Sequence, residues 1–282
     1  MSKNITQIGC TIFSPSYRRI TVVNNELHLF TDSYNPLYYV YNLDSHEWRS
    51  EKPIVVKHIK DICTNGNDIH IISYHYTDSK FTSGYYIYDT VNKKYKRLSD
   101  LPIKFIDAIK MININNIIHF FIAKDTNIYE YIYEESIGWT EVNKFTIENK
   151  VRYLTLANLD SITYIHTAHK GMWNQDNILY KIEGDSLIKE NENVSRNYSA
   201  FLTNTNTSIS YLYYTDDNPD NLGLFDYNPI TKEITTIENI TVDKINMFND
   251  VTFCNTNDSI FFTGTDVESV RMYQLYEIKE VI

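Results

Sequence analysis

The chain has 282 residues, of which 43% are apolar, so it can bury a sizeable core and wholesale disorder is excluded. Its 26 Lys and Arg residues against 36 Asp and Glu residues give a net charge of −10, which argues against nucleic acid and an anionic membrane as partners. The 24 Tyr and 13 Phe residues, set against only 8 Gly and 6 Pro, form a mixture typical of β-strands.

The first ten residues, MSKNITQIGC, lack the long apolar stretch of a signal peptide. No run in the chain approaches the roughly 18 apolar residues of a membrane helix. Three cysteines without a CxxC pair suit a reducing compartment. We therefore expect a cytoplasmic protein with no nucleic-acid partner, no membrane partner and no cofactor.

One pattern recurs along the chain: a strand, an Asn-rich turn, an apolar second strand, a polar loop and a third strand that ends in aromatic residues. The turns are marked by Asn24, Asn67, Asn115, Asn158, Asn204 and Asn255. The steps between these markers are 43, 48, 43, 46 and 51 residues. Asn tolerates the left-handed backbone of tight hairpin turns, so these positions predict hairpins.

An apolar second strand is expected after each turn. These strands are predicted at residues 27–30, 69–72, 117–122, 162–165, 209–214 and 260–262. Third strands end on a Tyr that precedes a further large apolar residue by six or seven positions, as in Tyr41 to Trp48 and Tyr88 to Tyr95. That spacing predicts a short turn and a fourth strand.

Four strands per unit at a period in the forties predict an all-β fold, a six-bladed β-propeller of four-stranded antiparallel blades. We expect one domain over residues 1–282, with blades at residues 14–53, 54–102, 103–146, 147–193, 194–240 and 241–282. The last unit lacks a fourth strand, and residues 5–13 are expected to supply it and to close the ring.

The later half of the repeat resembles the kelch family. The matching residues are Tyr41-Asn42, Tyr88-Asp89, Trp48, Trp139 and Leu101-Pro102. The double glycine that ends the second strand of a kelch repeat is missing from all six units. The resemblance implies a propeller that acts as a protein-binding platform, as most kelch-type propellers do, while a minority are sugar-modifying enzymes.

Each unit carries a cation shortly before its Asn-rich turn, where the innermost strand begins. These cations are Arg19, Lys60, Lys104, Arg152, Arg196 and Lys244. In a propeller the starts of the innermost strands approach one mouth of the central channel, so we expect a cationic ring that selects an anionic ligand. Some kelch propellers hold acidic peptides with arginines at this mouth, so the resemblance points the same way. Solvated side chains are the alternative interpretation.

Loops on the same face carry aromatic and acidic residues, and four of these complete the predicted binding site. They are Tyr34, Tyr76, Trp173 and Asp176. Trp173 lies in a polar loop, where it either folds over the neighbouring blade or serves as a stacking platform for a sugar or an anchor for a protein.

The sequence contains no phosphate-binding loop, HExxH motif or G-x-S-x-G motif, and we name no catalytic or metal-binding residue. It predicts a non-catalytic recognition module that binds a protein or peptide of acidic character over one channel mouth. The alternative is a single-site carbohydrate-binding lectin. A sugar-modifying propeller enzyme is the third hypothesis.

Overall fold

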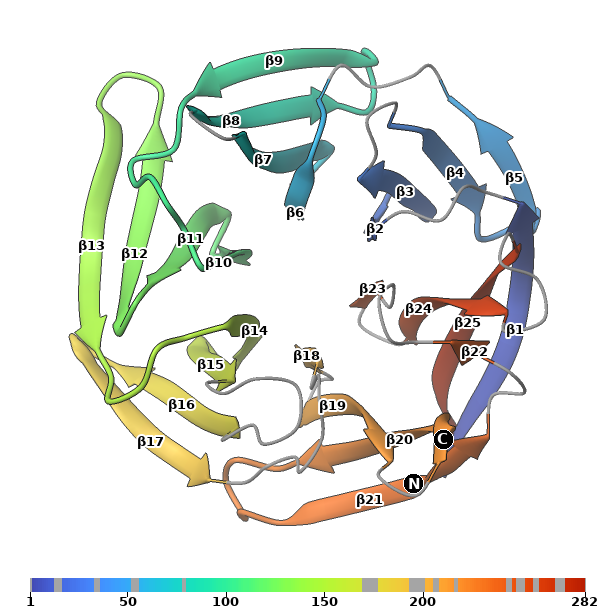
Figure 1. Ribbon diagram of the computed structural model, residues 1–282. Helices are drawn as coiled ribbons and strands as arrows, with labels where there is room; N and C mark the ends of the chain where they lie inside the picture. The colour runs from blue at the N-terminus through green and yellow to red at the C-terminus, as the bar shows by residue number, and fades with distance from the viewer. Residues whose placement is uncertain are drawn as a thin grey trace. The chain divides into compact units, whose positions relative to one another are not determined.

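The computed structural model describes residues 2–12, 17–32, 36–51, 56–77, 80–168, 177–192, 201–204, 208–215, 218–241, 245–246, 252–255, 259–266 and 272–281 (Figure 1). Regular structure in these segments consists of β-strands, as predicted. Within them, no helix has the length and apolar character needed to cross a membrane.

The chain forms two compact units, one from Met1–Leu101 with Thr241–Ile282 and one from Pro102–Ile240. The first unit holds three antiparallel sheets. The first sheet runs β2(Tyr17–Val23), β3(Glu26–Asp32), β4(Tyr38–Asn42) and β5(Glu47–Ser50). The second runs β6(Ile59–Asn65), β7(Asp68–Thr77), β8(Lys80–Asp89) and β9(Lys94–Ser99). The third contains β1(Ser2–Ile12), β22(Ile245–Asn246), β23(Thr252–Asn255), β24(Ser259–Asp266) and β25(Met272–Val281).

The second unit holds three four-stranded sheets. The first is β10(Ala108–Ile114), β11(Ile117–Lys124), β12(Asn127–Glu134) and β13(Gly138–Thr146). The next is β14(Tyr153–Leu159), β15(Ile162–Ala168), β16(Asn177–Glu183) and β17(Ser186–Glu192). The last is β18(Phe201–Asn204), β19(Ile209–Thr215), β20(Asn218–Tyr227) and β21(Ile234–Thr241).

Within each unit the sheets follow one another as blades in a propeller arrangement. The first strand of a sheet contacts the first strand of the next, so β23, β2 and β6 are neighbours in one unit and β10, β14 and β18 in the other. Between the first two blades, Val23, Phe30, Ile59, Ile69 and Ile71 form one buried apolar cluster. The predicted blade of four antiparallel strands is confirmed for five sheets.

The prediction of four strands in every blade is wrong for the sheet that joins the two ends of the chain. Both β22 and β23 pair with β24, so the innermost position is divided between two short strands and the sheet has five strands. The chain start does pair with the last strand, because β1 runs antiparallel along β25 from Ser2↔Val281 to Ile12↔Met272 (Figure 1).

Two of the Asn-rich turns adopt, at both of their Asn residues, the left-handed backbone that the sequence predicts. Positive φ angles occur at Asn24 (50°) and Asn25 (61°), and again at Asn115 (52°) and Asn116 (65°). Two consecutive residues with positive φ match the twist of the flanking strands, which is why these hairpins can be so tight. These two hairpins in turn fix the register of the first two strands of their blades.

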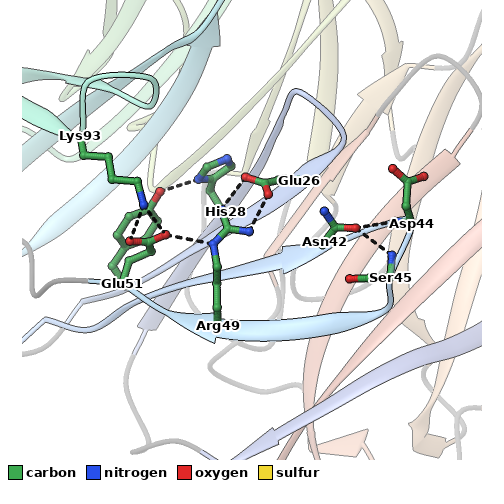
Figure 2. A network of polar contacts seen from close by, with 9 residues as sticks. Glu26, His28, Asn42, Asp44, Ser45, Arg49, Glu51 and Lys93 are labelled. Carbon is green, nitrogen blue, oxygen red and sulfur yellow. Dashed lines mark hydrogen bonds and ion pairs between the residues drawn. The ribbon is translucent and has the colours of Figure 1, made fainter.

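The Tyr-Asx step before the fourth strand has a local cause. The side-chain Oδ1 of Asn42 accepts the backbone N–H groups of Asp44 (2.9 Å) and Ser45 (2.8 Å), as Figure 2 shows. Asp89 and Asn228 accept the same pair of N–H groups in their own turns. The side-chain oxygen of the Asn or Asp residue takes the place of a backbone carbonyl as the acceptor in this turn. The turn therefore has a fixed length, which explains the seven-residue spacing between the Tyr that ends the third strand and the next large apolar residue.

A repeated ion pair connects neighbouring blades within each unit. Lys93 donates to Glu51 at 3.1 and 3.2 Å across 42 residues of sequence, and Lys232 donates to Glu190 across the same 42 residues. In the first blade the Arg49 guanidinium also donates two hydrogen bonds of 2.5 and 2.6 Å to the Glu26 carboxylate and one of 3.0 Å to the Glu51 carboxylate (Figure 2). Each Lys lies in the turn before the fourth strand of its blade and has a positive φ, 54° at Lys93 and 63° at Lys232.

Gly84 on β8 is buried beneath the ring of Tyr86. A Cβ at Gly84 would lie 2.5 to 2.7 Å from the outer ring atoms of Tyr86, which also packs against the Arg97 guanidinium 6.0 Å away. Gly84→Ala is therefore expected to displace this ring and to lower the free energy of unfolding by about 1–2 kcal/mol. Urea denaturation checks the value. In a Tyr86→Ala background, Gly84→Ala should lower the free energy of unfolding only slightly. If the loss were as large there as in the unchanged protein, a clash with the Tyr86 ring would not be its cause.

Candidate functional site

The start of β6 lies against the start of β2. Register along the β6–β7 pair passes from Ile59↔Ser73 to Asp61↔Ile72, so Lys60 is the extra residue of a β-bulge. Bulges re-aim a side chain and occur often beside functional sites. The Arg19 Nε on β2 donates to the Lys60 carbonyl oxygen at 2.7 Å. Two of the predicted cations are thereby brought together at neighbouring innermost strands.

A row of aromatic rings begins at Lys60 and continues along the β7–β8 hairpin. The Lys60 Nζ lies 5.6 Å from the centre of the Tyr74 ring, and the Tyr74 and Tyr76 rings are 5.9 Å apart. Tyr76 is paired with Phe81 in the register, and their rings are 5.0 Å apart. Residues two apart on a strand and their cross-strand partners share one face, so the three rings form one surface. Tyr76 is 40% exposed.

We call Arg19, Lys60, Tyr74, Tyr76 and Phe81 the blade-2 surface. Its cations offer charge-assisted hydrogen bonds to carboxylates, and its aromatic rings offer flat apolar area. This combination can bind and orient a ligand.

On the opposite face of the hairpin, a second pair of rings lies close together. The His58 and His75 imidazoles stack with centroids 3.9 Å apart and planes 9° from parallel. The backbone N–H of Tyr74 also donates to the His58 carbonyl at 3.3 Å. His58 has a φ of 56°, an uncommon value for a residue with a large side chain. These contacts fasten the chain just before β6 to the hairpin.

In the second unit, an exposed cation followed directly by an exposed aromatic residue stands near the start of two innermost strands. Lys104 lies in the segment before β10 and is followed by Phe105, which is 64% exposed and has a φ of 57°. Arg152 comes directly before β14 and is followed by Tyr153, which is 53% exposed. A positive φ in a bulky residue is an outlier that occurs often at binding sites.

The backbone around Arg152 is held from both sides. The N–H of Val151 donates to the Asp125 carbonyl at 3.0 Å, and the N–H of Arg152 donates to the Ala168 carbonyl at 2.9 Å. Lys150 bridges the carboxylates of Asp107 (2.9 Å) and Asp125 (3.4 Å). The backbone that carries the exposed Arg152 side chain is therefore held in place, so a ligand bound there does not have to order this segment of the backbone.

The ten predicted site residues divide into three groups. Arg19, Lys60 and Tyr76 are linked by contacts in the blade-2 surface. Lys104 and Arg152 lie at the starts of their blades, although Lys104 is in the preceding segment and not on the strand. The remaining residues lie outside the described part of the chain: Tyr34, Trp173, Asp176, Arg196 and Lys244. The exposed Phe105 and Tyr153 were missed, although each directly follows a predicted cation.

Three histidines at the same position of the second strands each have a polar partner within their own blade, although the Nε2 atom of His28 is buried without a hydrogen-bond partner. His28 is 2.6 Å from the Tyr38 hydroxyl, His70 is 2.5 Å from that of Tyr85, and His119 is 2.6 Å from Glu130. Each of these contacts joins the second strand to the third strand of the same blade. Among the described residues no cluster of three or more His, Cys, Asp or Glu side chains is placed to hold a metal ion. No family model and no curated protein matches the chain.

Proposed function

We propose that this protein is a non-catalytic recognition module whose blade-2 surface binds a protein or peptide segment of acidic character. The observation that supports the proposal is the unbroken row of contacts from Arg19 through Lys60 to the exposed Tyr76. Arg and Lys can pair with ligand carboxylates, while Tyr76 and Phe81 can cover apolar parts of the same ligand.

The charge of the whole chain makes local cations important for such a ligand. At a net charge of −10, the protein repels acidic partners in general. A cationic patch on this background attracts an acidic segment in one place and one orientation, which favours specificity and rapid association. Lys104 and Arg152, with the aromatic residues that follow them, are proposed to act in the same way in the second unit.

Loss of both blade-2 cations should weaken binding strongly. The probe is a synthetic peptide of alternating Glu and Tyr residues, and a peptide of alternating Gln and Tyr isolates the effect of charge. We expect Arg19→Ala with Lys60→Ala to weaken binding of the Glu-Tyr peptide by about 10- to 100-fold and to reduce its salt dependence. Isothermal titration calorimetry at low and moderate salt measures both effects.

The matched control replaces two exposed lysines of β9, Lys94 and Lys96, by alanine. This variant has the same net charge as the test variant and should bind like the unchanged protein. Two results would contradict the hypothesis that Arg19 and Lys60 bind ligand carboxylates. One is equal affinity of the unchanged protein for the two peptides, and the other is an equal loss of affinity for the Glu-Tyr peptide in the two variants.

A glycan ligand is the competing outcome. Exposed aromatic rings also stack on sugars, so the protein should be applied to a glycan array at low and moderate salt. A discrete glycan signal that is lost in Tyr76→Ala or Trp173→Ala, without binding of the Glu-Tyr peptide, would make the protein a single-site lectin and replace the present proposal.

Three further sequence predictions stay proposals. The repeat count predicts that the blades form one domain and one ring, closed where β1 meets β25. The resemblance to kelch repeats rests on the Tyr-Asx step and the tryptophans. A cytoplasmic location is expected from the sequence composition.

A further inference from the structure

The aromatic part of the blade-2 surface is carried by a two-stranded arm. The ladder between β6 and β7 ends at Ser73, and the ladder between β8 and β9 ends at Tyr85. Beyond these points β7 and β8 continue as an antiparallel pair to Thr77↔Lys80. The surface therefore lies on a narrow ribbon that starts where the neighbouring strands of the blade end, and a peptide segment can lie along such a ribbon in an extended conformation.

The three rings on this arm form a compact triangle. The Tyr74 ring is 5.9 Å from that of Tyr76 and 6.1 Å from that of Phe81, and the rings of Tyr76 and Phe81 are 5.0 Å apart. One aromatic side chain of a ligand can contact all three rings at once, and Tyr76 is 40% exposed. The triangle therefore offers one apolar site to a ligand.

The cation stands at one corner of this triangle. The Lys60 Nζ is 5.6 Å from the centre of the Tyr74 ring. In an extended chain, side chains two residues apart lie on the same face about 6.6 Å from each other, whereas adjacent side chains point to opposite faces. A carboxylate at Lys60 and a ring on the triangle therefore fit ligand residues that are two positions apart.

We infer that the blade-2 surface selects an extended segment in which an acidic and an aromatic residue are two positions apart and share one face. The inference rests on the proposed function and adds the sequence pattern of the ligand to it. The acidic residue lies at the base of the arm, because Arg19 joins Lys60 there through its hydrogen bond to the Lys60 carbonyl. A second acidic residue on the same face extends toward Arg19.

Two heptapeptides of equal composition and charge test this pattern. In Glu-Ser-Glu-Ser-Tyr-Ser-Tyr all four large side chains share one face of an extended chain, and we call it the same-face peptide. In Glu-Ser-Glu-Tyr-Ser-Tyr-Ser, the opposite-face peptide, the Tyr side chains lie opposite the Glu side chains. We expect the unchanged protein to bind the same-face peptide several-fold more tightly, as measured by fluorescence anisotropy of end-labelled peptides at constant low salt.

Two variants assign the contacts within the same-face peptide. In Lys60→Ala, replacement of the Glu residues of the peptide by Gln should change affinity less than it does in the unchanged protein, which identifies Lys60 as a partner of the carboxylates. In Tyr76→Ala, the preference for the same-face peptide should disappear. Lys96→Ala on β9 is the matched control for Lys60→Ala and should keep both the preference and the full effect of the Gln replacement. Thermal melts verify that each variant is folded.

The outcomes distinguish the inference from the proposed function. Equal affinity of the unchanged protein for the two heptapeptides overturns the inference and leaves recognition of acidic segments standing. Binding of the longer Glu-Tyr peptide without binding of either heptapeptide has the same meaning. If the Glu-Tyr peptide and both heptapeptides fail to bind, the proposed function itself is overturned.

Discussion

Removal of residues 1–12 is expected to lower the melting temperature by about 10 °C or more, since roughly 1 kcal/mol corresponds to 2–4 °C in a protein of this size class. The deletion removes the whole of β1 and leaves β25 as an open edge. It also removes Ile8, which packs against the buried cluster that contains Leu27 and Tyr41 and whose carbonyl accepts the Tyr41 hydroxyl. Differential scanning calorimetry measures the loss.

Tyr41→Phe is the matched control for this deletion. It removes the hydrogen bond to β1 but keeps the ring and the strand, so it should cost only about 1 kcal/mol. A truncated protein with the melting temperature of the full chain would show that β1 contributes nothing to stability. It would also refute the predicted role of the chain start in completing the last blade.

Glu190→Gln should destabilise the second unit by about 2–3 kcal/mol, because the nearly buried carboxylate loses its charge and with it the charge-assisted hydrogen bonds from Lys232 and Tyr227. Only 4% of the Glu190 side chain is exposed, and it accepts the Tyr227 hydroxyl at 2.8 Å as well as the ammonium of Lys232. Glu183 is the comparison, since it is 53% exposed and pairs with Lys181 at 2.6 Å. Glu183→Gln should change stability by less than about 0.5 kcal/mol.

The Glu190 contribution also has a pH signature. Burial raises the pKa of Glu190, but the hydrogen bonds from Lys232 and Tyr227 and the charges of Lys232 and Lys181 outweigh this effect, and the pKa is lowered from 4.5. Its stabilisation is therefore complete above pH 4.5 and is lost as the pH falls through the lowered value. Chemical denaturation at pH 7 and in acid should show a smaller difference between Glu190→Gln and the unchanged protein in acid. Equal stability of the two proteins at pH 7 would contradict a stabilising role for the contacts of Lys232 and Tyr227 with Glu190.

The fold was predictable where one local rule repeats. Asn24-Asn25 and Asn115-Asn116 predict hairpins because few other residues adopt positive φ. Tyr-Asx steps mark the turn before the fourth strand in three blades because the Asx side chain makes that turn. The divided inner strand of the last sheet has no such local signal. It depends on how β22 and β23 both pair with β24.

The site was only partly predictable, because its contacts join segments that are distant in sequence. Lys60 could be named as a cation at a strand start, but the bulge that places it against Tyr74 depends on its register with β7. The stack of His58 on His75 arises from the same pairing. The exposure of Phe105 follows from its backbone conformation, which a sequence pattern of apolar residues does not reveal.

The pairing of β1 with β25 also affects when the chain can fold as it is made. Among the strands described here, β1 is synthesised first and its partner β25 last. Four consecutive strands such as β6 to β9 can pair as soon as they emerge, whereas β1 must wait for nearly the whole chain and must then close a very long loop. During this interval β1 is an unpaired strand, so a nascent chain is open to wrong strand pairing at β1.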